Sequence, residues 1–295
     1  MTSRWTSLVA LSLAALALIG CGQATSPEGS QTLAVDSGGD DGFEPYKNER
    51  FSKALSNIFA NGSDGNTRWS VSIRAYGPRG QKLSLYRQSA ERAVKPASTM
   101  KILTSWIAFQ KIPSASTIGS DKYSYIREMM KYSDNTMAEN ILGWCGGVSA
   151  SYSMLTNFGI SKSAQLNIAD GSGLSYHNRL AADDLVQILS GIRASAKMKA
   201  FRSLLPVAGV DGTLAGRLGN VNGTIAAKTG TLINDPTAAL AGYGDSRTGW
   251  QIVFAILGDS VPSVDSGRAS IDSALTEVIS TLNYLPASSS AVAAN

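Results

Sequence analysis

Strand-forming segments lie near both ends of the folded part of this 295-residue chain, and helical segments occupy the stretch between them. Residues 69–73 alternate apolar and polar side chains, which predicts a half-buried strand, and residues 81–88 are expected to form the returning strand after a turn. Three more strands are predicted late in the chain, at 225–231, 237–243 and 250–257. The predicted fold class is therefore α+β, with one sheet assembled from both ends of the chain around an inserted helical subdomain.

Apolar residues recur at helical spacing through the middle of the chain. In residues 98–111 they include Ile102, Leu103, Trp106 and Ile107. Helices are also predicted over 120–143, 149–158, 181–194 and 266–282. Hydrophobic residues make up 43% of the chain, a content that supports a core and excludes wholesale disorder.

Charge and residue counts exclude several classes of function. Lys and Arg number 26 and Asp and Glu number 22, and this sparse balance does not indicate a nucleic-acid partner. Two cysteines and one histidine leave almost nothing for a Cys/His zinc site, and no metal or organic cofactor is implied. Because His177 is the only histidine, we expect it to be structural or exposed, and a hydrolase of this sequence to use another base.

The amino terminus predicts export and anchoring. Arg4 precedes an apolar run, Leu8–Ile19, that has the length of a signal peptide and is too short for a spanning helix. The run ends in Leu-Ile-Gly-Cys, which resembles the lipobox of bacterial lipoproteins. The resemblance implies cleavage before Cys21, lipid attachment to that residue, and anchoring to a membrane without spanning it. We expect the folded domain to lie in the periplasm. Gly22, rather than Asp, follows the cysteine, and by the same resemblance this favours the outer membrane in a Gram-negative cell.

Composition divides the chain into four parts. They are the signal peptide at 1–20, the lipidated terminus and flexible tether at 21–45, the folded domain at 46–285 and a disordered tail at 286–295. With Cys21 acylated, Cys145 is the only remaining thiol, so no internal disulfide is possible and we expect Cys145 to be buried.

Ser98 and Lys101 form the first motif that carries chemistry. Residues three apart share a helix face, so the Lys101 amine can lie beside the Ser98 hydroxyl. A helix start also directs free N–H groups toward a nucleophile or an oxyanion. If Lys101 is desolvated, its pKa falls and it can serve as a base for Ser98. Alone, the pattern also fits a helix N-terminus with a solvated lysine.

Ser133, Asp134 and Asn135 form a second motif at the start of a predicted helix. A hydroxyl and an amide two residues apart can both face a cleft, while Asp134 is expected to be structural and to point away from it. Taken alone, the triplet is also typical of a helix N-cap.

The third motif is Lys228-Thr229-Gly230-Thr231, on the strand predicted at 225–231. The side chain of Lys228 and the threonine hydroxyls can meet a carboxylate, and Gly230 would let a ligand approach the strand closely. Alone, Lys228 also fits an edge-strand lysine that discourages aggregation.

In this order and on these elements, the three motifs resemble those of the penicillin-recognising serine enzymes. The stretches at 170–175, 205–214 and 227–232 are similar to the D-alanyl-D-alanine carboxypeptidase/endopeptidase group of low-molecular-mass penicillin-binding proteins. The resemblance covers about residues 65–260. It implies a β-lactamase/transpeptidase-like fold, with an antiparallel sheet flanked by helices, and a catalytic domain at 46–285. It also implies a serine peptidase acting on peptidoglycan stem peptides, with β-lactams as covalent inhibitors.

The same resemblance implies the acylation roles. Ser98 would be the nucleophile that attacks the penultimate D-Ala carbonyl, and Lys101 its base. Ser133 would pass the proton to the departing D-alanine and bridge Lys101 and Lys228.

The resemblance also implies how substrate would be held. Asn135 would bond the substrate amide, and Lys228, Thr229 and Thr231 would hold the terminal carboxylate. Backbone N–H groups of Ser98 and Thr231 would form the oxyanion hole.

The chain departs from that group in one large way. Only residues 102–132 separate the first two motifs, so the insertion domains are missing and substrate preference, carboxypeptidase or endopeptidase, stays open. Residues 170–175 fit a tight turn or a cleft wall equally well. Residues 211–213 are predicted to be a turn and helix cap.

Two rival functions remain. A serine β-lactamase needs a glutamate that activates water, and the only glutamate between Ser133 and Lys228 is Glu139, which is predicted to lie on a helix surface. Asp170 could replace it only if its loop folded into the site. The second rival is a catalytically inactive wall-binding lipoprotein, and the three intact motifs argue against it.

Overall fold

The computed structural model describes residues 42–112 and 121–287. The predicted signal peptide, the acylation site Cys21, most of the tether and nearly all of the predicted tail lie outside the described residues. Within the part that is described, no helix is both long enough and apolar enough to cross a membrane.

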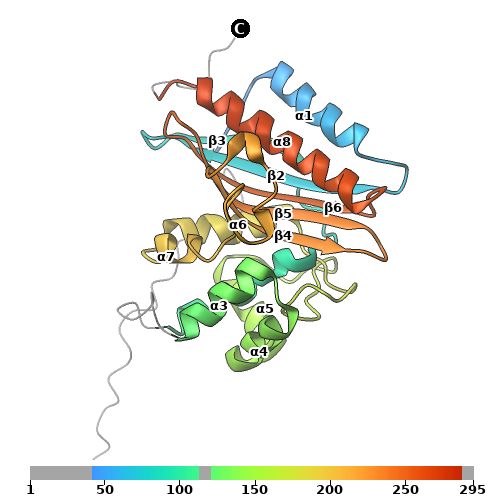
Figure 1. The fold of residues 1–295 in the computed structure, drawn as a ribbon, viewed down its shortest axis with the longest axis vertical. Helices are drawn as coiled ribbons and strands as arrows, with labels where there is room; N and C mark the ends of the chain where they lie inside the picture. The colour runs from blue at the N-terminus through green and yellow to red at the C-terminus, as the bar shows by residue number, and fades with distance from the viewer. Residues whose placement is uncertain (1–41, 113–120, 288–295) are drawn as a thin grey trace, which may run out of the picture. The chain divides into compact units, whose positions relative to one another are not determined.

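One six-stranded sheet forms from both ends of the chain, in the order β1-β3-β2-β6-β5-β4 (Figure 1). The strands are β1 (Glu44–Pro45), β2 (Arg68–Tyr76), β3 (Lys82–Gln88), β4 (Ile225–Leu232), β5 (Thr237–Asp245) and β6 (Gln251–Asp259). The early β2 pairs along its whole length with the late β6, in a register that sets Arg68 opposite Asp259. Pairing is antiparallel throughout, except that the short β1 lies parallel to β3. The predicted α+β assembly is confirmed.

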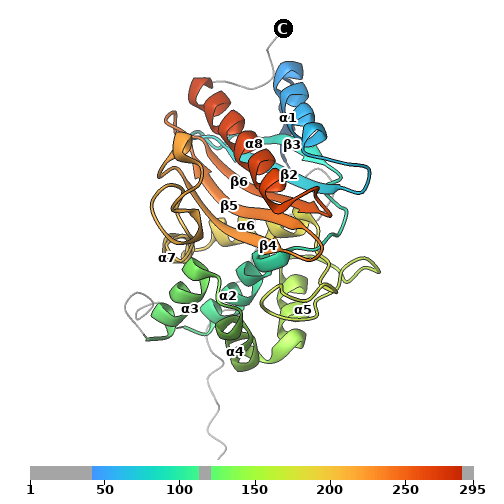
Figure 2. The same cartoon turned by 45° about the vertical axis from the view of Figure 1, so that its right-hand side comes forward.

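Helices cover both faces of this sheet. They are α1 (Glu49–Asn61), α2 (Lys101–Gln110), α3 (Asp121–Tyr132), α4 (Asn135–Cys145), α5 (Gly147–Asn157), α6 (Ala182–Ala194), α7 (Met198–Arg202) and α8 (Val264–Tyr284), with 3-10 turns η1 (Ala97–Met100), η3 (Gly212–Leu214) and η4 (Gly219–Val221). Helices α1 and α8 pack on one face, and α6 lies on the other beside the inserted helices α2 to α5 (Figures 1 and 2). Each face has its own hydrophobic core.

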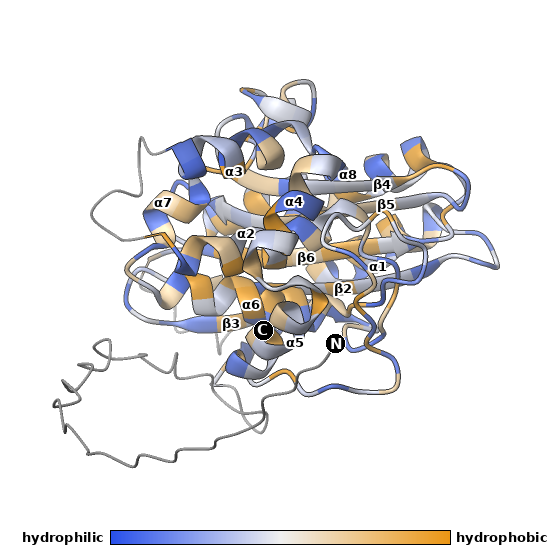
Figure 3. Ribbon diagram, turned by 90° about the horizontal axis from the view of Figure 1, so that it is seen from below, coloured by the Kyte–Doolittle hydropathy of each residue, from blue (hydrophilic) through white to orange (hydrophobic). Residues whose placement is uncertain are grey.

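The prediction of a half-buried strand at 69–73 is wrong, because β2 is buried on both faces. Its polar positions Ser70 and Ser72 are fully buried. The hydroxyl of Ser70 donates to the carbonyl of Ala90 and accepts the N–H of Ala182 at the start of α6. Helix α6 is largely hydrophobic and covers the face that the alternation assigned to solvent (Figure 3). In the sequence, the buried and hydrogen-bonded Ser70 therefore has the same pattern as a serine that faces solvent.

The helix predicted over 120–143 is two helices, α3 and α4, separated at Ser133. Ser133 has a φ of 64°, a left-handed conformation that cannot continue a right-handed helix. The next helix starts afresh, with the Asp134 carboxylate accepting the Met137 N–H as an N-cap. This break turns the second motif out of the helix and toward β4.

Candidate active site

Ser98 and Lys101 meet where η1 passes into α2. Nζ of Lys101 lies 2.9 Å from Oγ of Ser98, and Lys101 is fully buried while Ser98 is partly exposed. Burial lowers the pKa of Lys101 to about 8, although the nearby charges of Asp170 and Glu139 act in the opposite direction. A protonated Lys101 donates to the hydroxyl, whereas its neutral amine can accept the Ser98 proton. The pair can therefore act as nucleophile and base.

The Lys101 ammonium is held by two further acceptors. They are Oδ1 of Asn135, at 2.7 Å, and the carbonyl oxygen of Ser172, also at 2.7 Å. Because Oδ1 of Asn135 accepts from Lys101, the NH₂ group is the part of this amide that remains to meet a substrate. The first two motifs and the 170–175 loop therefore converge on one nitrogen.

The second buried lysine, Lys228, belongs to β4 and faces Ser133. Its Nζ donates to Oγ of Ser133 and to the carbonyl oxygen of Thr229, each at 2.8 Å. Burial, and then the charge of Lys101, hold the pKa of Lys228 well below that of an ordinary lysine. The sequence predicts that Ser133 bridges both lysines. In this structure Ser133 contacts Lys228, and the partner that the second motif offers to Lys101 is Asn135.

The hydroxyls of the third motif have partners from other parts of the chain. Oγ1 of Thr229 lies 2.8 Å from Oγ1 of Thr213 in η3. Oγ1 of Thr231 accepts from Nη2 of Arg268 in α8, at 3.1 Å. No pattern around Arg268 indicated this contact in the sequence.

Gly230 allows β4 to approach the segment that leads into Ser98. A Cβ at this position would lie 2.9 Å from the carbonyl oxygen of Pro96 and 3.1 Å from Cβ of Ala97. The sequence predicts a close approach by a ligand, but here the chain itself makes that approach. Thr231 and Ser98, whose N–H groups are the predicted oxyanion hole, thus belong to segments in direct contact.

The loop at 170–175 is both a tight turn and a wall of the site. The Asp170 carboxylate accepts the N–H groups of Gly173 and Ser175, which closes the turn. Gly173 has a φ of +80°, and a Cβ there would lie 1.8 Å from the carbonyl oxygen of Ala97. The loop therefore packs against the residue that precedes the nucleophile.

A cleft of about 460 Å³ lies along this loop and the start of α4. Its lining residues are Asn135, Thr136, Glu139, Asp170, Ser172, Leu174 and Ser175. Because Asn135 and Ser172 both contact Lys101, the cleft runs beside the reactive pair.

Glu139 does more than the predicted helix-surface residue would. Its side chain is exposed, but its carboxylate accepts the N–H of Ser172 at 2.8 Å and that of Gly171 at 3.3 Å. The glutamate thereby fixes the peptide whose carbonyl oxygen contacts Lys101. Sequence reasoning missed this role because helix α5 and the segment after it separate the loop from α4 along the chain.

Asp211 differs from its predicted role as a turn and cap. The turn into η3 forms, but the Asp211 carboxylate makes no cap and instead pairs with buried Lys131 at 2.6 Å and accepts the Val207 N–H. Lys131 lies two residues before Ser133, so this pair holds the second motif against the loop that contacts β4. Two other expectations are confirmed: His177 is exposed and Cys145 is buried.

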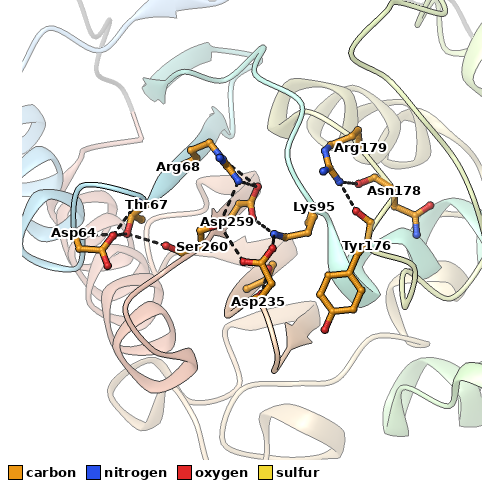
Figure 4. Close-up of polar contacts among 11 residues, drawn as sticks. Asp64, Thr67, Arg68, Lys95, Tyr176, Asn178, Arg179, Asp235, Asp259 and Ser260 are labelled. Carbon is orange, nitrogen blue, oxygen red and sulfur yellow. Dashed lines mark hydrogen bonds and ion pairs between the residues drawn. The ribbon is translucent and has the colours of Figure 1, made fainter.

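A buried ionic cluster lies beside the nucleophile segment (Figure 4). The Lys95 ammonium pairs with Asp235 in the β4–β5 turn and, at 2.6 Å, with Asp259 at the end of β6. Arg68 holds the other oxygen of Asp259 at 3.1 Å. Side chains of Lys95 and Asp259 are only 3% and 2% exposed. Since Lys95 is three residues before Ser98, the cluster joins that segment to the end of β4.

Comparison with known proteins shows which sequences this chain resembles. The D-Ala-D-Ala carboxypeptidase 3 (S13) family matches residues 122–278, a stretch that holds the second and third motifs. The chain is 36% identical over 167 residues to a carboxypeptidase DacB of Mycolicibacterium smegmatis, covering 50% of this chain and 35% of that protein. It is 31% identical over 145 residues to a D-alanyl-D-alanine carboxypeptidase DacB of Haemophilus influenzae, covering 44% and 30%. The chain thus spans about a third of the length of these relatives.

Solved structures share the fold. Penicillin binding protein 4 of Haemophilus influenzae superposes with a TM-score of 0.61 at 14% identity, covering 78% of this chain and 99% of that one. The TLA-3 extended-spectrum β-lactamase also gives 0.61, at 16% identity, covering 80% and 99%. At such identities the likeness concerns the fold alone, and the predicted β-lactamase/transpeptidase-like architecture is confirmed.

Proposed function

The chain belongs to the D-Ala-D-Ala carboxypeptidase 3 (S13) family, and on that premise we propose that it is a serine D-Ala-D-Ala carboxypeptidase acting on peptidoglycan stem peptides. The observation that carries the proposal is the contact between the Ser98 hydroxyl and the buried amine of Lys101. A lysine with a pKa of about 8 is neutral in a useful fraction of molecules near neutral pH, so it can act as a base without a histidine.

Acylation begins with the neutral Lys101 amine. It accepts the Ser98 proton while Oγ attacks the carbonyl carbon of the penultimate D-alanine, and the carbonyl oxygen becomes an oxyanion. Backbone N–H groups of Ser98 and Thr231 stabilise that oxyanion. As the tetrahedral intermediate collapses, the C–N bond breaks, and the proton that Lys101 took from Ser98 is relayed through Ser133 to the leaving nitrogen, so that Ser133 and Lys101 return to their starting protonation states. D-alanine departs, and an ester on Ser98 remains.

Hydrolysis of the ester completes the cycle. A water molecule attacks the ester carbonyl, the peptide leaves with a new carboxyl group, and Ser98 regains its proton. In a β-lactam the opened ring stays attached to the acyl group and obstructs the same approach of water. Both oxygens of Glu139 accept backbone N–H groups of the 170–175 loop, which favours a role in holding the loop over one in activating water. We therefore expect slow release of penicillin and faster release of D-alanine.

Parallel assays of the purified protein test this function. One follows D-alanine release from a peptide that ends in D-Ala-D-Ala, and the other follows hydrolysis of benzylpenicillin, with Ser98→Ala as the control in both. Release of D-alanine that Ser98→Ala abolishes, together with a long-lived penicillin adduct, supports the carboxypeptidase. Fast turnover of penicillin without D-alanine release contradicts it and favours the β-lactamase.

We further propose that the protein is lipid-anchored in the periplasm, with the outer membrane favoured. The support is the apolar run that leads into Leu-Ile-Gly-Cys, with Cys21 as the expected first residue after cleavage, and the acidic, glycine-rich stretch that follows it. The wild-type protein should partition into detergent, and Cys21→Ser should lose both the lipid and the partitioning. Mass spectrometry that finds an unmodified mature terminus at another residue would exclude the anchor.

A further inference from the structure

The geometry points to Arg268 of α8 as a specificity-determining residue that binds the terminal carboxylate of the peptide substrate together with Thr231. This inference rests on the proposed function and adds to it a residue outside all three sequence motifs. It concerns recognition of the substrate and leaves the roles of Ser98 and Lys101 unchanged.

Close packing of α8 on the sheet brings Arg268 to β4. Gly267 lies against Ala238 of β5, where a Cβ on the glycine would come within 2.7 Å of the Ala238 Cβ. Ala238 is the register partner of Thr231 in the neighbouring strand. The residue that follows the glycine, Arg268, thereby reaches across β5, and its Nη2 lies 3.1 Å from Oγ1 of Thr231.

The second contact of Arg268 leaves its guanidinium open to a ligand. Nη1 lies 3.5 Å from a carboxylate oxygen of Asp265, and that carboxylate is 94% exposed. An ion pair in water at this distance is weak and easily exchanged. The Arg268 side chain is itself 41% exposed, so its remaining N–H donors can reach an incoming carboxylate.

Hydrogen-bond counting shows what the Thr231 hydroxyl can do. A hydroxyl has one proton to donate and two lone pairs that accept. Arg268 donates to one of these lone pairs, which directs the proton of Thr231 elsewhere. A carboxylate beside β4 would accept this O–H from Thr231 and an N–H from Arg268, so the pair forms a matched two-point donor.

Charge also favours Arg268 over Lys228 as the attraction for an anion. Lys228 is fully buried, and burial and then the charge of Lys101 lower its pKa well below that of an ordinary lysine, which disfavours its charged form. Its nitrogen is already bonded to Ser133 and to the Thr229 carbonyl. The guanidinium of Arg268, by contrast, is partly exposed and has the planar fork of donors that matches a carboxylate. The accessible guanidinium that contacts β4 thus comes from α8.

The test compares acyl donors that differ only in this carboxylate. Benzylpenicillin and its methyl ester are reacted with the wild-type protein and with Arg268→Gln, and the second-order rate of Ser98 acylation is measured for each. We expect Arg268→Gln to slow acylation by the free acid about 10- to 100-fold, the usual loss for one charged hydrogen-bonding group, and to change the ester rate less than about twofold. Arg268→Lys keeps the charge but loses the planar fork, so its rate of acylation by the free acid should lie between those of the wild-type protein and Arg268→Gln.

Arg217→Gln is the matched control. Arg217 pairs at 2.6 Å with Asp272, which lies on α8 as Arg268 does. The contacts described for Arg217 include none of the motif residues. It should leave both rates as in the wild type. Equal slowing of acid and ester by Arg268→Gln would overturn the inference, because it would indicate a general disturbance of the site. Failure of the wild-type protein to form any Ser98 adduct would instead overturn the proposed function.

Discussion

Raising the pH from 6 to 9 should accelerate acylation of Ser98, because Lys101 must be neutral to accept the proton. Burial lowers the pKa of Lys101 to about 8, so about a tenth of the molecules are competent at pH 7 and about nine-tenths at pH 9. The rate should therefore rise roughly tenfold between pH 7 and pH 9 and then level off. With an ordinary lysine pKa near 10.5, the competent fraction at pH 7 would be about 300-fold smaller.

The assay is the initial rate of labelling by a fluorescent penicillin, at concentrations well below saturation and at each pH. The rate of reagent hydrolysis in buffer alone is subtracted, and circular dichroism checks that the protein stays folded. Glu139→Gln supplies a second measurement, because the Glu139 charge raises the pKa of Lys101 and its removal should move the midpoint to lower pH. A rate that is constant or falls between pH 7 and 9 would refute the assignment of Lys101 as the base.

Two substitutions test the supports of the site. Gly173→Ala should slow acylation and lower the melting temperature, because its Cβ would lie 1.8 Å from the Ala97 carbonyl oxygen, whereas Gly80→Ala, at a similar φ with nothing within 4 Å, should show only the smaller backbone cost. Equal effects of these two alanines would contradict the packing argument. Lys95→Met should reduce the free energy of unfolding in urea by about 1–3 kcal/mol, because it leaves the buried Asp259 carboxylate with Arg68 as its remaining cation and one oxygen without its lysine. A loss below about 1 kcal/mol would show that the cluster is not a structural support.

Local sequence patterns were sufficient to predict those parts of the site whose residues lie close together on one helix or strand. Ser98 and Lys101 are three residues apart, so a helix alone brings them together. The strand of the third motif could also be predicted, because β-branched residues recur along it and the turn residues Asn234, Asp235 and Pro236 follow it. The contacts of Asn135 with Lys101 and of Lys228 with Ser133 join different elements and depend on the tertiary fold. Only the resemblance to known enzymes led us to expect that the three motifs would meet.

Contacts between distant segments were not predictable in the same way. Arg268 meets Thr231, and Lys95 meets Asp235, across long stretches of chain that no local periodicity connects. A charged residue on a helix or before a proline has the same sequence pattern whether it is paired or solvated. Glu139 illustrates the point, since its partners are backbone N–H groups that carry no sequence signature.

Some misses had a signal that could have been used. In α1, Phe51, Leu55 and Phe59 recur every four residues and are buried, and Asn48 accepts the Phe51 N–H as its N-cap. That combination predicts an amphipathic helix, yet none was assigned there. The break between α3 and α4 at Ser133 had a weaker signal. Ser-Asp-Asn is typical of a helix N-cap and so indicates a new helix start, but the same triplet is also compatible with residues that line a cleft.

Mapping of the penicillin adduct tests most directly whether Ser98 is a nucleophile activated by Lys101. The mature protein is incubated with benzylpenicillin at about pH 8, digested, and examined by mass spectrometry. We predict one penicilloyl group per chain, on the peptide that contains Ser98, absent from Ser98→Ala and formed at least about 100-fold more slowly by folded Lys101→Met. Undiminished labelling of folded Ser98→Ala, or an adduct on another residue, would contradict the account.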